Sequence, residues 1–114
     1  MIDAQRVDFI AVPVEDRERA ARFYGQTLDF RKNPNSTDTW VEFETGNVAL
    51  ALADPPSAGQ PFAPLPFGAI VIRVPDVESA KAKFQDAGAV FKDSEGNGLA
   101  IHHRYAPYLD GTMP

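Results

Sequence analysis

The hydrophobic positions of the chain change period several times, and each change predicts an element of secondary structure. Residues 7–14, VDFIAVPV, are apolar and β-branched, which is typical of a strand. Residues 15–28 then place an apolar stripe at helical spacing, and Asp16 is a candidate N-cap for that helix. The residues that follow predict three strands, over 28–31, 39–45 and 48–53.

The second half of the chain repeats this order after a proline-rich segment. Residues 54–67, DPPSAGQPFAPLPF, hold five of the ten prolines, so they predict a linker. A strand over 68–74 comes next, and a helix over 75–88 has Asp76 as its candidate N-cap. Two further strands are expected, a short one over 89–91 and a last one over 99–103. The similarity of the halves indicates a duplicated motif.

Three stretches, in order along the chain, carry a resemblance to a known family. They are VDFIAVPVEDRERAARFYGQTLDF (7–30), IRVPDVESAKAKFQDAGAVF (72–91) and DSEGNGLAIHH (93–103). On these residues the chain resembles the vicinal oxygen chelate superfamily, which includes glyoxalase I, bleomycin-resistance proteins and extradiol dioxygenases. Asp29 stands where glycine is commoner. The resemblance implies an α+β fold in which two βαβββ modules curl a mixed sheet around a shared concave pocket, usually completed in a dimer.

The resemblance also implies a division of the chain and one departure from the family pattern. We expect a single domain over 1–114, with module one at about 5–53, the linker at 54–67, module two at about 68–104 and a tail at 105–114. Only Lys92 separates Phe91 from Asp93, so the second module is expected to lack one strand. An uncovered sheet edge favours association, so we expect a homodimer.

The metal-dependent members of the family place one His, Gln or Glu on each of four strands. The matching positions in this chain are Phe9, Ala51, Ala69 and Ala100. None of these side chains can coordinate a cation. We therefore expect no divalent metal and no other cofactor.

Period-two alternation predicts which side chains line the pocket. Alternate residues of a strand point to opposite faces, so these four residues face the pocket while Ile10, Val12 and Val14 pack beneath the first helix. The same parity adds polar side chains to the small apolar floor. The expected ligand-binding residues are Phe9, Trp40, Glu42, Ala51, Ala69, Arg73, Ala100 and His102, with no catalytic residue and no metal ligand among them.

Each polar candidate also has a purely structural interpretation. Trp40 is either a platform for stacking a ligand or a core or interface residue, and Glu42 is either a partner for a cation or part of a solvated strand face. Arg73 lies close to a strand end, where a surface or dimer ion pair explains it better than ligand binding does. His102 is at most one metal ligand, and it is better explained as a polar wall residue. His103 has the opposite parity and is expected to be structural or exposed.

Composition argues against several classes of function. The net charge of −5 disfavours nucleic-acid binding, because an acidic chain repels phosphates. No cysteine is present, which excludes disulfides and thiolate chemistry, and no apolar run reaches the length of a membrane span. Residues 1–10 lack the basic-then-apolar layout of a signal peptide, so we expect a cytoplasmic protein.

Three functions remain open from the sequence. The first is metal-free binding of a small organic ligand, aromatic or cationic, as in the bleomycin-resistance branch. The second is a lyase, isomerase or dioxygenase that uses Glu42 or His102 with a non-standard metal site. The third is a protein-interaction module at the open edge of module two. The four non-coordinating positions favour binding over catalysis.

Overall fold

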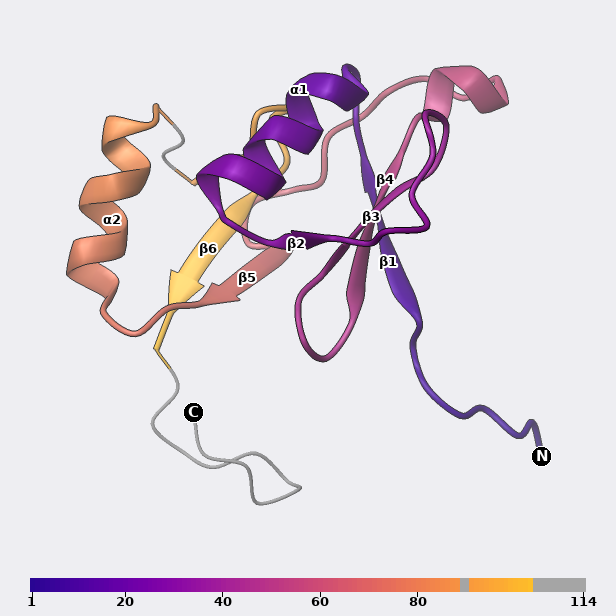
Figure 1. Cartoon of the computed structure of the whole chain (residues 1–114), viewed down its shortest axis with the longest axis horizontal. Helices are drawn as coiled ribbons and strands as arrows, with labels where there is room; N and C mark the ends of the chain where they lie inside the picture. Colours follow the sequence, from indigo (N-terminus) through magenta and orange to yellow (C-terminus); the bar gives the residue numbers. More distant parts are fainter. Residues whose placement is uncertain (89–90, 104–114) are drawn as a thin grey trace. The chain divides into compact units, whose positions relative to one another are not determined.

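A computed structural model describes residues 1–88 and 91–103 of the chain (Figure 1). It contains two compact units, which meet between Pro64 and Leu65. We call them unit 1, residues 1–64, and unit 2, from residue 65 onward. The boundary lies inside the segment predicted as a linker, part of which is the 3-10 helix η2 (Pro55–Ala58). The predicted tail over 105–114 lies outside the described residues.

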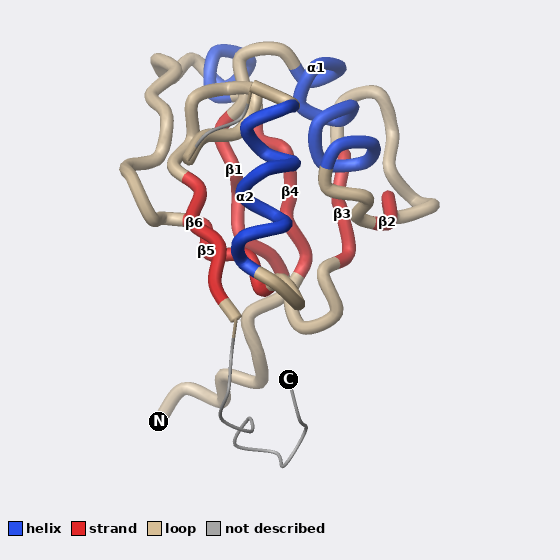
Figure 2. The backbone as a smooth tube through the Cα atoms, turned by 90° about the vertical axis from the view of Figure 1, so that its left-hand side faces the viewer, coloured by secondary structure: helices blue, strands red, loops and turns tan. Residues whose placement is uncertain are grey.

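Unit 1 contains a four-stranded sheet. Its strands are β1 (Phe9–Pro13), β2 (Arg31–Lys32), β3 (Val41–Glu44) and β4 (Ala49–Ala53). They lie in the order β1-β4-β3-β2, with β1 and β4 parallel and the other pairs antiparallel (Figure 2). Three of the predicted strands are confirmed with slightly narrower bounds. The fourth, expected over 28–31, is displaced and begins only at Arg31.

The first helix covers one face of this sheet. It consists of α1 (Arg17–Arg22) and a π-helical turn, η1 (Phe23–Thr27). Asp16 caps it as predicted, because its carboxylate accepts the N–H of Arg19 at 3.0 Å. Tyr24 is fully buried, and its ring lies 6.2 Å from that of Phe43 on β3.

The core of unit 1 forms between this helix and the bulky face of the sheet. Val12 and Val14 are fully buried there, as predicted, but Ile10 is 47% exposed. Ile10 lies near the start of β1, whose first three residues are all exposed, so the helix covers only the later part of this strand. The buried apolar residues of unit 1 are Val12, Val14, Ala20, Phe23, Tyr24, Val41, Phe43, Ala49, Leu50, Ala51 and Leu52.

Asp29 ends the helical segment with a left-handed backbone. Its φ is +59°, a conformation in which a side chain is strained and glycine is not. This explains in physical terms why glycine suits this position better than other residues. Aspartate is one of the few residues that visit this region at moderate cost.

The described part of unit 2 repeats the first strand, the helix and the last strand of unit 1 but has fewer strands in between. Strands β5 (Ile70–Arg73) and β6 (Leu99–His102) pair in parallel, and α2 (Val77–Asp86) connects them. Asp76 caps α2, accepting the N–H of Ser79 at 3.0 Å. Beyond this pair, the described part of unit 2 adds one isolated antiparallel bridge, Lys92 to Gly98. The expected strand over 89–91 falls mostly outside the described residues.

The two repeats can be aligned at equivalent residues, because each has an aspartate N-cap and an isoleucine–leucine pair between its first and last strands. Ile10 pairs with Leu50 in unit 1, and Ile70 pairs with Leu99 in unit 2. In unit 1, 34 positions separate the helix N-cap, Asp16, from Leu50 on the last strand of the repeat. In unit 2, only 23 positions separate the equivalent residues, Asp76 and Leu99. The second repeat is therefore 11 residues shorter over this interval, which agrees with the predicted shortfall in module two.

Hydrogen bonds join the turn before β6 to the first residue of unit 2, Leu65. Asn97 is fully buried, its amide donates to the carboxylate of Asp93 at 2.8 Å, and its side-chain oxygen accepts the N–H of Leu65 at 2.8 Å. The N–H of Gly98 donates to the carbonyl of Leu65 at 3.0 Å. A Cβ atom on Gly98 would overlap the carbonyl oxygen of Pro66, so only glycine fits here.

We expect Gly98→Ala to destabilise the protein by about 2–3 kcal/mol, because the added methyl group overlaps backbone that cannot rotate away. Urea unfolding measures the change. Gly88→Ala is the matched control in the same unit: a Cβ there meets open space, and only its φ of +70° opposes alanine. A smaller effect, of about 1 kcal/mol, is expected for the control. Equal effects of the two variants would contradict the steric explanation.

The second prediction concerns the loss of folding stability at acidic pH. Hydrogen bonds from the Ser79 side chain and backbone hold the pKa of Asp76 below its ordinary value of 3.8. A lowered pKa means that the carboxylate contributes stability above the unfolded value, and that this is lost as the pH falls through the folded value. The amide introduced by Asp76→Asn would also cap the helix but cannot titrate. We expect wild type to exceed this variant in unfolding free energy at about pH 6 and to lose that advantage as the pH falls from about 4 towards 2. A constant difference across this range would disprove the linkage.

Candidate functional site

Strand register in unit 1 gathers four of the predicted site residues on one face of the sheet. Residues directly opposite each other in neighbouring strands share a face. Phe9 pairs with Ala49, and Ala51 pairs with Glu42. Trp40 precedes β3 by one residue and has the same parity as Glu42. Phe9, Trp40, Glu42 and Ala51 therefore lie on the face opposite the helix, as predicted.

Trp40 is held on this face by two contacts. Its ring lies edge-to-face against Phe9, with centroids 5.3 Å apart and planes at 80°. Its indole N–H donates to a carboxylate oxygen of Glu42 at 2.9 Å. Phe9 and Trp40 are each 42% exposed. The two rings thus form a fixed aromatic surface beside a negative charge, and both rings remain open to solvent.

The floor between these side chains is small and apolar. Ala51 is fully buried, and its neighbour on β1 in the same register is Ala11. Methyl groups at these positions let the large rings of Phe9 and Trp40 approach each other across the strands. Period-two alternation predicts such a small apolar floor on the face of the sheet away from the helix.

The other four predicted residues lie in unit 2, also on one face of their sheet. Val71 pairs with Ala100, and Arg73 pairs with His102. Val71 is 55% exposed, whereas Leu99 on the opposite face is buried beside α2. Ala69 directly precedes β5 and shares the parity of Val71. The face that was predicted to line the pocket is therefore the face away from α2.

The two adjacent histidines have separate roles. His102 is exposed on β6, opposite Arg73. His103 turns the other way, and its Nδ1 lies 3.0 Å from the carbonyl oxygen of Val74. The predicted structural role of His103 is confirmed, and the two side chains do not converge on one point.

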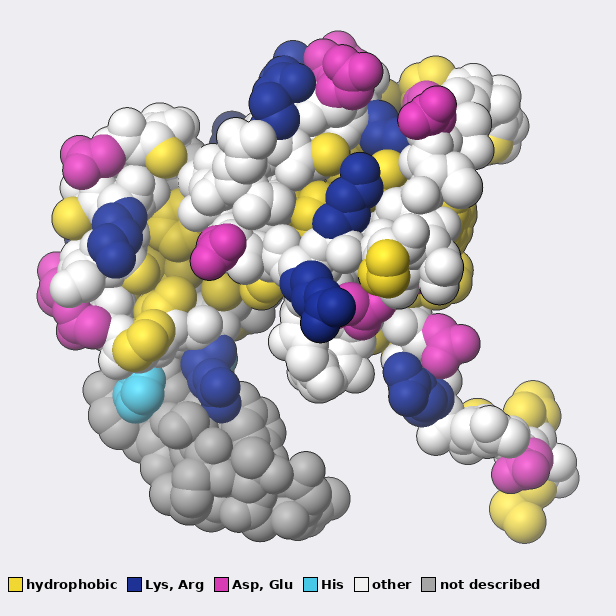
Figure 3. Space-filling model, in the orientation of Figure 1, with side chains coloured by type: hydrophobic (Ala, Val, Ile, Leu, Met, Phe, Trp, Pro, Cys, Tyr) yellow, Lys and Arg dark blue, Asp and Glu magenta, His cyan; other side chains and the backbone are white. Residues whose placement is uncertain are grey.

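Unit 2 also contains an apolar groove between α2 and β6, which sequence analysis did not predict. Its apolar walls come from Phe84, Phe91, Leu99 and Ile101, and Lys81 and Gln85 border it. Ala100, one of the predicted site residues, also lines it. Figure 3 shows hydrophobic side chains gathered at this place, between α2 and β6. In unit 1 the equivalent space beneath the helix is filled by β3, whose Val41 and Phe43 pair with Leu52 and Leu50. The groove is thus the consequence of the shorter second repeat.

The residues at the four family ligand positions do not fit a divalent metal. A phenyl ring and three methyl groups offer no lone pair to a cation. Over residues 1–88 and 91–103, no three His, Asp or Glu side chains come together as a group that could hold a metal ion.

The helices in these ranges are all too short or too polar to span a bilayer.

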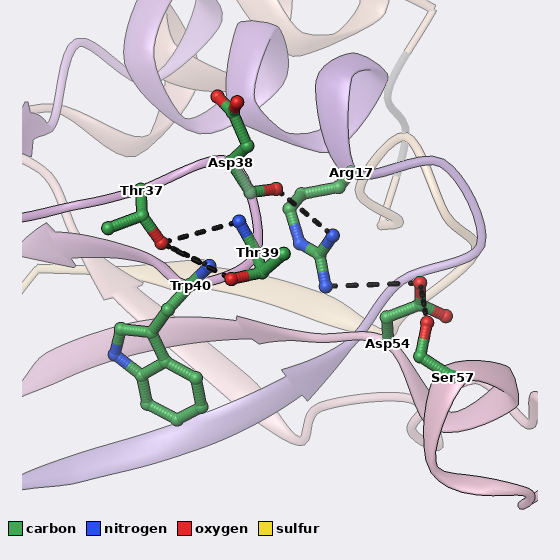
Figure 4. Close-up of polar contacts among 7 residues, drawn as sticks. All are labelled: Arg17, Thr37, Asp38, Thr39, Trp40, Asp54 and Ser57. Atoms are coloured by element: carbon green, nitrogen blue, oxygen red, sulfur yellow. Dashed lines mark hydrogen bonds and ion pairs between the residues drawn. The ribbon is translucent and has the colours of Figure 1, made fainter.

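A polar cluster behind Trp40 was missed by sequence analysis. Arg17 contacts the loop before Trp40 through the carbonyl oxygen of Asp38 and lies 3.8 Å from the carboxylate of Asp54 (Figure 4). One sequence signal could have indicated it. Arg17 is the first residue of α1, where the helix dipole disfavours a positive charge, so arginine there implies a specific partner.

Comparisons with known proteins give a family and a fold. Residues 6–109 match the profile of the Glyoxalase/Bleomycin resistance protein/Dioxygenase superfamily. A search of curated protein sequences gives no significant match.

Solved structures with the same fold come from several bacteria. TnmS3, an antibiotic binding protein from Streptomyces sp. CB03234, is 21% identical with a TM-score of 0.69, over 90% of this chain and 98% of its own. A superfamily member from Sphaerobacter thermophilus is 20% identical with a TM-score of 0.72, over 90% and 100%. Lactoylglutathione lyase from Agrobacterium tumefaciens is 16% identical with a TM-score of 0.66, over 88% and 94%. At these identities the similarity establishes the α+β fold and leaves the ligand open.

Proposed function

Because the chain belongs to the Glyoxalase/Bleomycin resistance protein/Dioxygenase superfamily, we propose that it binds a small organic molecule without a metal ion. The binding surface is the face of unit 1 that carries Phe9, Trp40 and Glu42. The ligand class is an aromatic compound with a positive charge. The similar fold of TnmS3, described as an antibiotic binding protein, is compatible with this class of function.

One observation carries the proposal: the half-exposed indole of Trp40 is already fixed in place before any ligand arrives. Its N–H is satisfied by Glu42 and its ring packs against Phe9, so its conformation is restrained. A restrained aromatic side chain loses little entropy when it stacks on a ligand, and this improves affinity. A protein surface keeps adjacent large aromatics exposed at some cost, which favours a binding role for this surface.

The charge near Trp40 selects for a cation. Glu42 uses one carboxylate oxygen for the indole N–H and can present the other to a ligand. The face of an indole ring attracts cations through its quadrupole, worth about 0.5–2 kcal/mol depending on exposure. The net charge of −5 favours the approach of cations and disfavours anions.

Trp40→Ala tests the proposal. Thermal unfolding is followed in the presence of a panel of cationic aromatic compounds and of uncharged compounds with the same rings. For a wild-type ligand at about 100 times its Kd, we expect stabilisation of about 2.7 kcal/mol, or roughly 10 °C. Trp40→Ala should lose most of this shift, and the uncharged compounds should give less in wild type.

Matched variants separate binding from general effects of mutation. Ile10→Ala removes an exposed apolar side chain from the opposite face of the same sheet and should keep the shift. Glu42→Gln should weaken binding of the cationic compounds, whereas Glu18→Gln makes the same charge change on α1 and should not. A shift that survives Trp40→Ala would overturn the proposed surface.

A metal titration addresses the enzymatic alternative. Ni²⁺, Zn²⁺, Mn²⁺ and Mg²⁺ are each added to protein treated with chelator, in the same thermal assay. Metal-free binding predicts that organic ligands stabilise the protein equally with and without these ions. Stabilisation by an ion at stoichiometric concentration would favour a metal-dependent enzyme instead.

We further propose that the protein is a cytoplasmic homodimer. In the described part of unit 2, the outer edge of β6 is paired only at its beginning, through the Lys92–Gly98 bridge and the bond from the N–H of Leu99 to the carbonyl of Phe91. Among the described residues the rest of that edge is free, and a free edge favours association. Light scattering after size exclusion should give twice the mass of the 12.5 kDa chain. A monomer at micromolar concentration would contradict the dimer without affecting the ligand proposal.

A further inference from the structure

We propose that Arg17 is a positioning residue for Trp40: its guanidinium fixes the loop of residues 37–40 against the start of α1 and thereby sets the orientation of the indole ring. The consequence for ligand affinity rests on the function proposed above. The positioning itself is a property of the free protein.

The loop that carries Trp40 is closed on itself. The N–H of Thr37 donates to the carbonyl of Trp40 at 2.8 Å, and the N–H of Trp40 donates to the hydroxyl of Thr37 at 3.1 Å. The same hydroxyl oxygen lies 3.3 Å from the N–H of Thr39. These bonds make residues 37–40 a small rigid unit, so whatever holds its middle also holds the backbone of Trp40.

Arg17 contacts the middle of this loop. Its Nη1 donates to the carbonyl oxygen of Asp38 at 3.3 Å, and its Nη2 lies 3.8 Å from Oδ2 of Asp54. Asp54 follows β4 directly and is itself held by the hydroxyl of Ser57 at 2.7 Å. Figure 4 shows the guanidinium lying between the loop and Asp54. A planar guanidinium reaches the loop and Asp54 with two separate nitrogens, whereas a lysine ammonium presents all of its donors from a single nitrogen.

Arginine is a poor choice at this position for stability alone. Its charge lies at the positive end of the helix dipole, which is unfavourable. Its Nε is buried without a hydrogen-bond partner among the described residues, and a buried unsatisfied donor destabilises the fold. The Arg17 and Asp54 side chains are only 22% and 25% exposed, so solvent screens their attraction less than at an open surface. A residue that opposes folding in two ways and still contacts the Trp40 loop points to a role in the geometry of the site.

The chain offers a direct reporter, because Trp40 is its only tryptophan. Tryptophan emission selected at the red edge of absorption, and the indole bands of the near-UV circular dichroism, therefore report on this one side chain. The variants are Arg17→Ala, Arg17→Lys and Thr37→Val, which opens the loop without changing any charge. Arg22→Ala is the matched control, because Arg22 is an exposed arginine of the same helix.

We expect Arg17→Ala and Thr37→Val to shift the emission of Trp40 to the red and to reduce its near-UV signal, while far-UV dichroism is unchanged. Arg17→Lys should fall between Arg17→Ala and wild type, and Arg22→Ala should match wild type. All spectra are recorded well below the unfolding temperature of each variant. Cationic aromatic compounds that bind wild type should bind Arg17→Ala about tenfold more weakly, as expected if the freed loop holds the indole in the binding orientation for roughly a tenth of the time.

The two proposals fail in different ways. If Trp40 emission and near-UV dichroism are the same in Arg17→Ala and wild type, the positioning role is overturned, whatever binds. If these spectra change as expected but no compound binds wild type, the positioning role is supported and the proposed ligand class is wrong. If Arg22→Ala changes the spectra as much as Arg17→Ala, the effect belongs to helix charge and the positioning role is again overturned.

Discussion

The separation of alanine from leucine side chains along β4 is the constraint on which the rest of the structure depends. Leu50 and Leu52 point beneath the helix, and Ala49 and Ala51 point away from it. A slip of one residue in register would exchange the two sets, placing methyl groups under the helix and leucines on the face that carries Phe9 and Trp40. The register therefore fixes both the core and the surface on which Phe9 and Trp40 meet.

Much of the fold could be predicted from the sequence, because the decisive signals are local. Asp16 and Asp76 were identified as N-caps from their place before an amphipathic run, and both accept the expected backbone N–H. The π-helical turn at η1 and the late start of β2 were not predicted. The turn closed between Leu28 and Phe23 carries Tyr24, whose ring packs against Phe43. Tyr24 and Phe43 are far apart in the sequence, so no local pattern shows this contact.

The candidate site was likewise predictable only in part. Parity alone placed Phe9, Glu42 and Ala51 on a common face. The contact between Phe9 and Trp40 spans strands that are not neighbours in the sheet, so no pattern within one segment reveals it. The groove beside α2 also escaped prediction. The shorter interval in the second repeat is visible in the sequence, but the space beside α2 depends on which side chains surround it.

Unequal repeats imply unequal local stability. In unit 1 the helix buries Ala20, Phe23 and Tyr24, whereas α2 buries none of its residues. Segments with little buried apolar surface open more readily than the rest of a native protein. Amide protons of α2 should therefore exchange with solvent sooner than those of α1, through fluctuations that leave the aromatic pair of unit 1 intact. The shorter repeat is therefore the looser one, while the longer repeat keeps Phe9 and Trp40 on a firmly packed sheet.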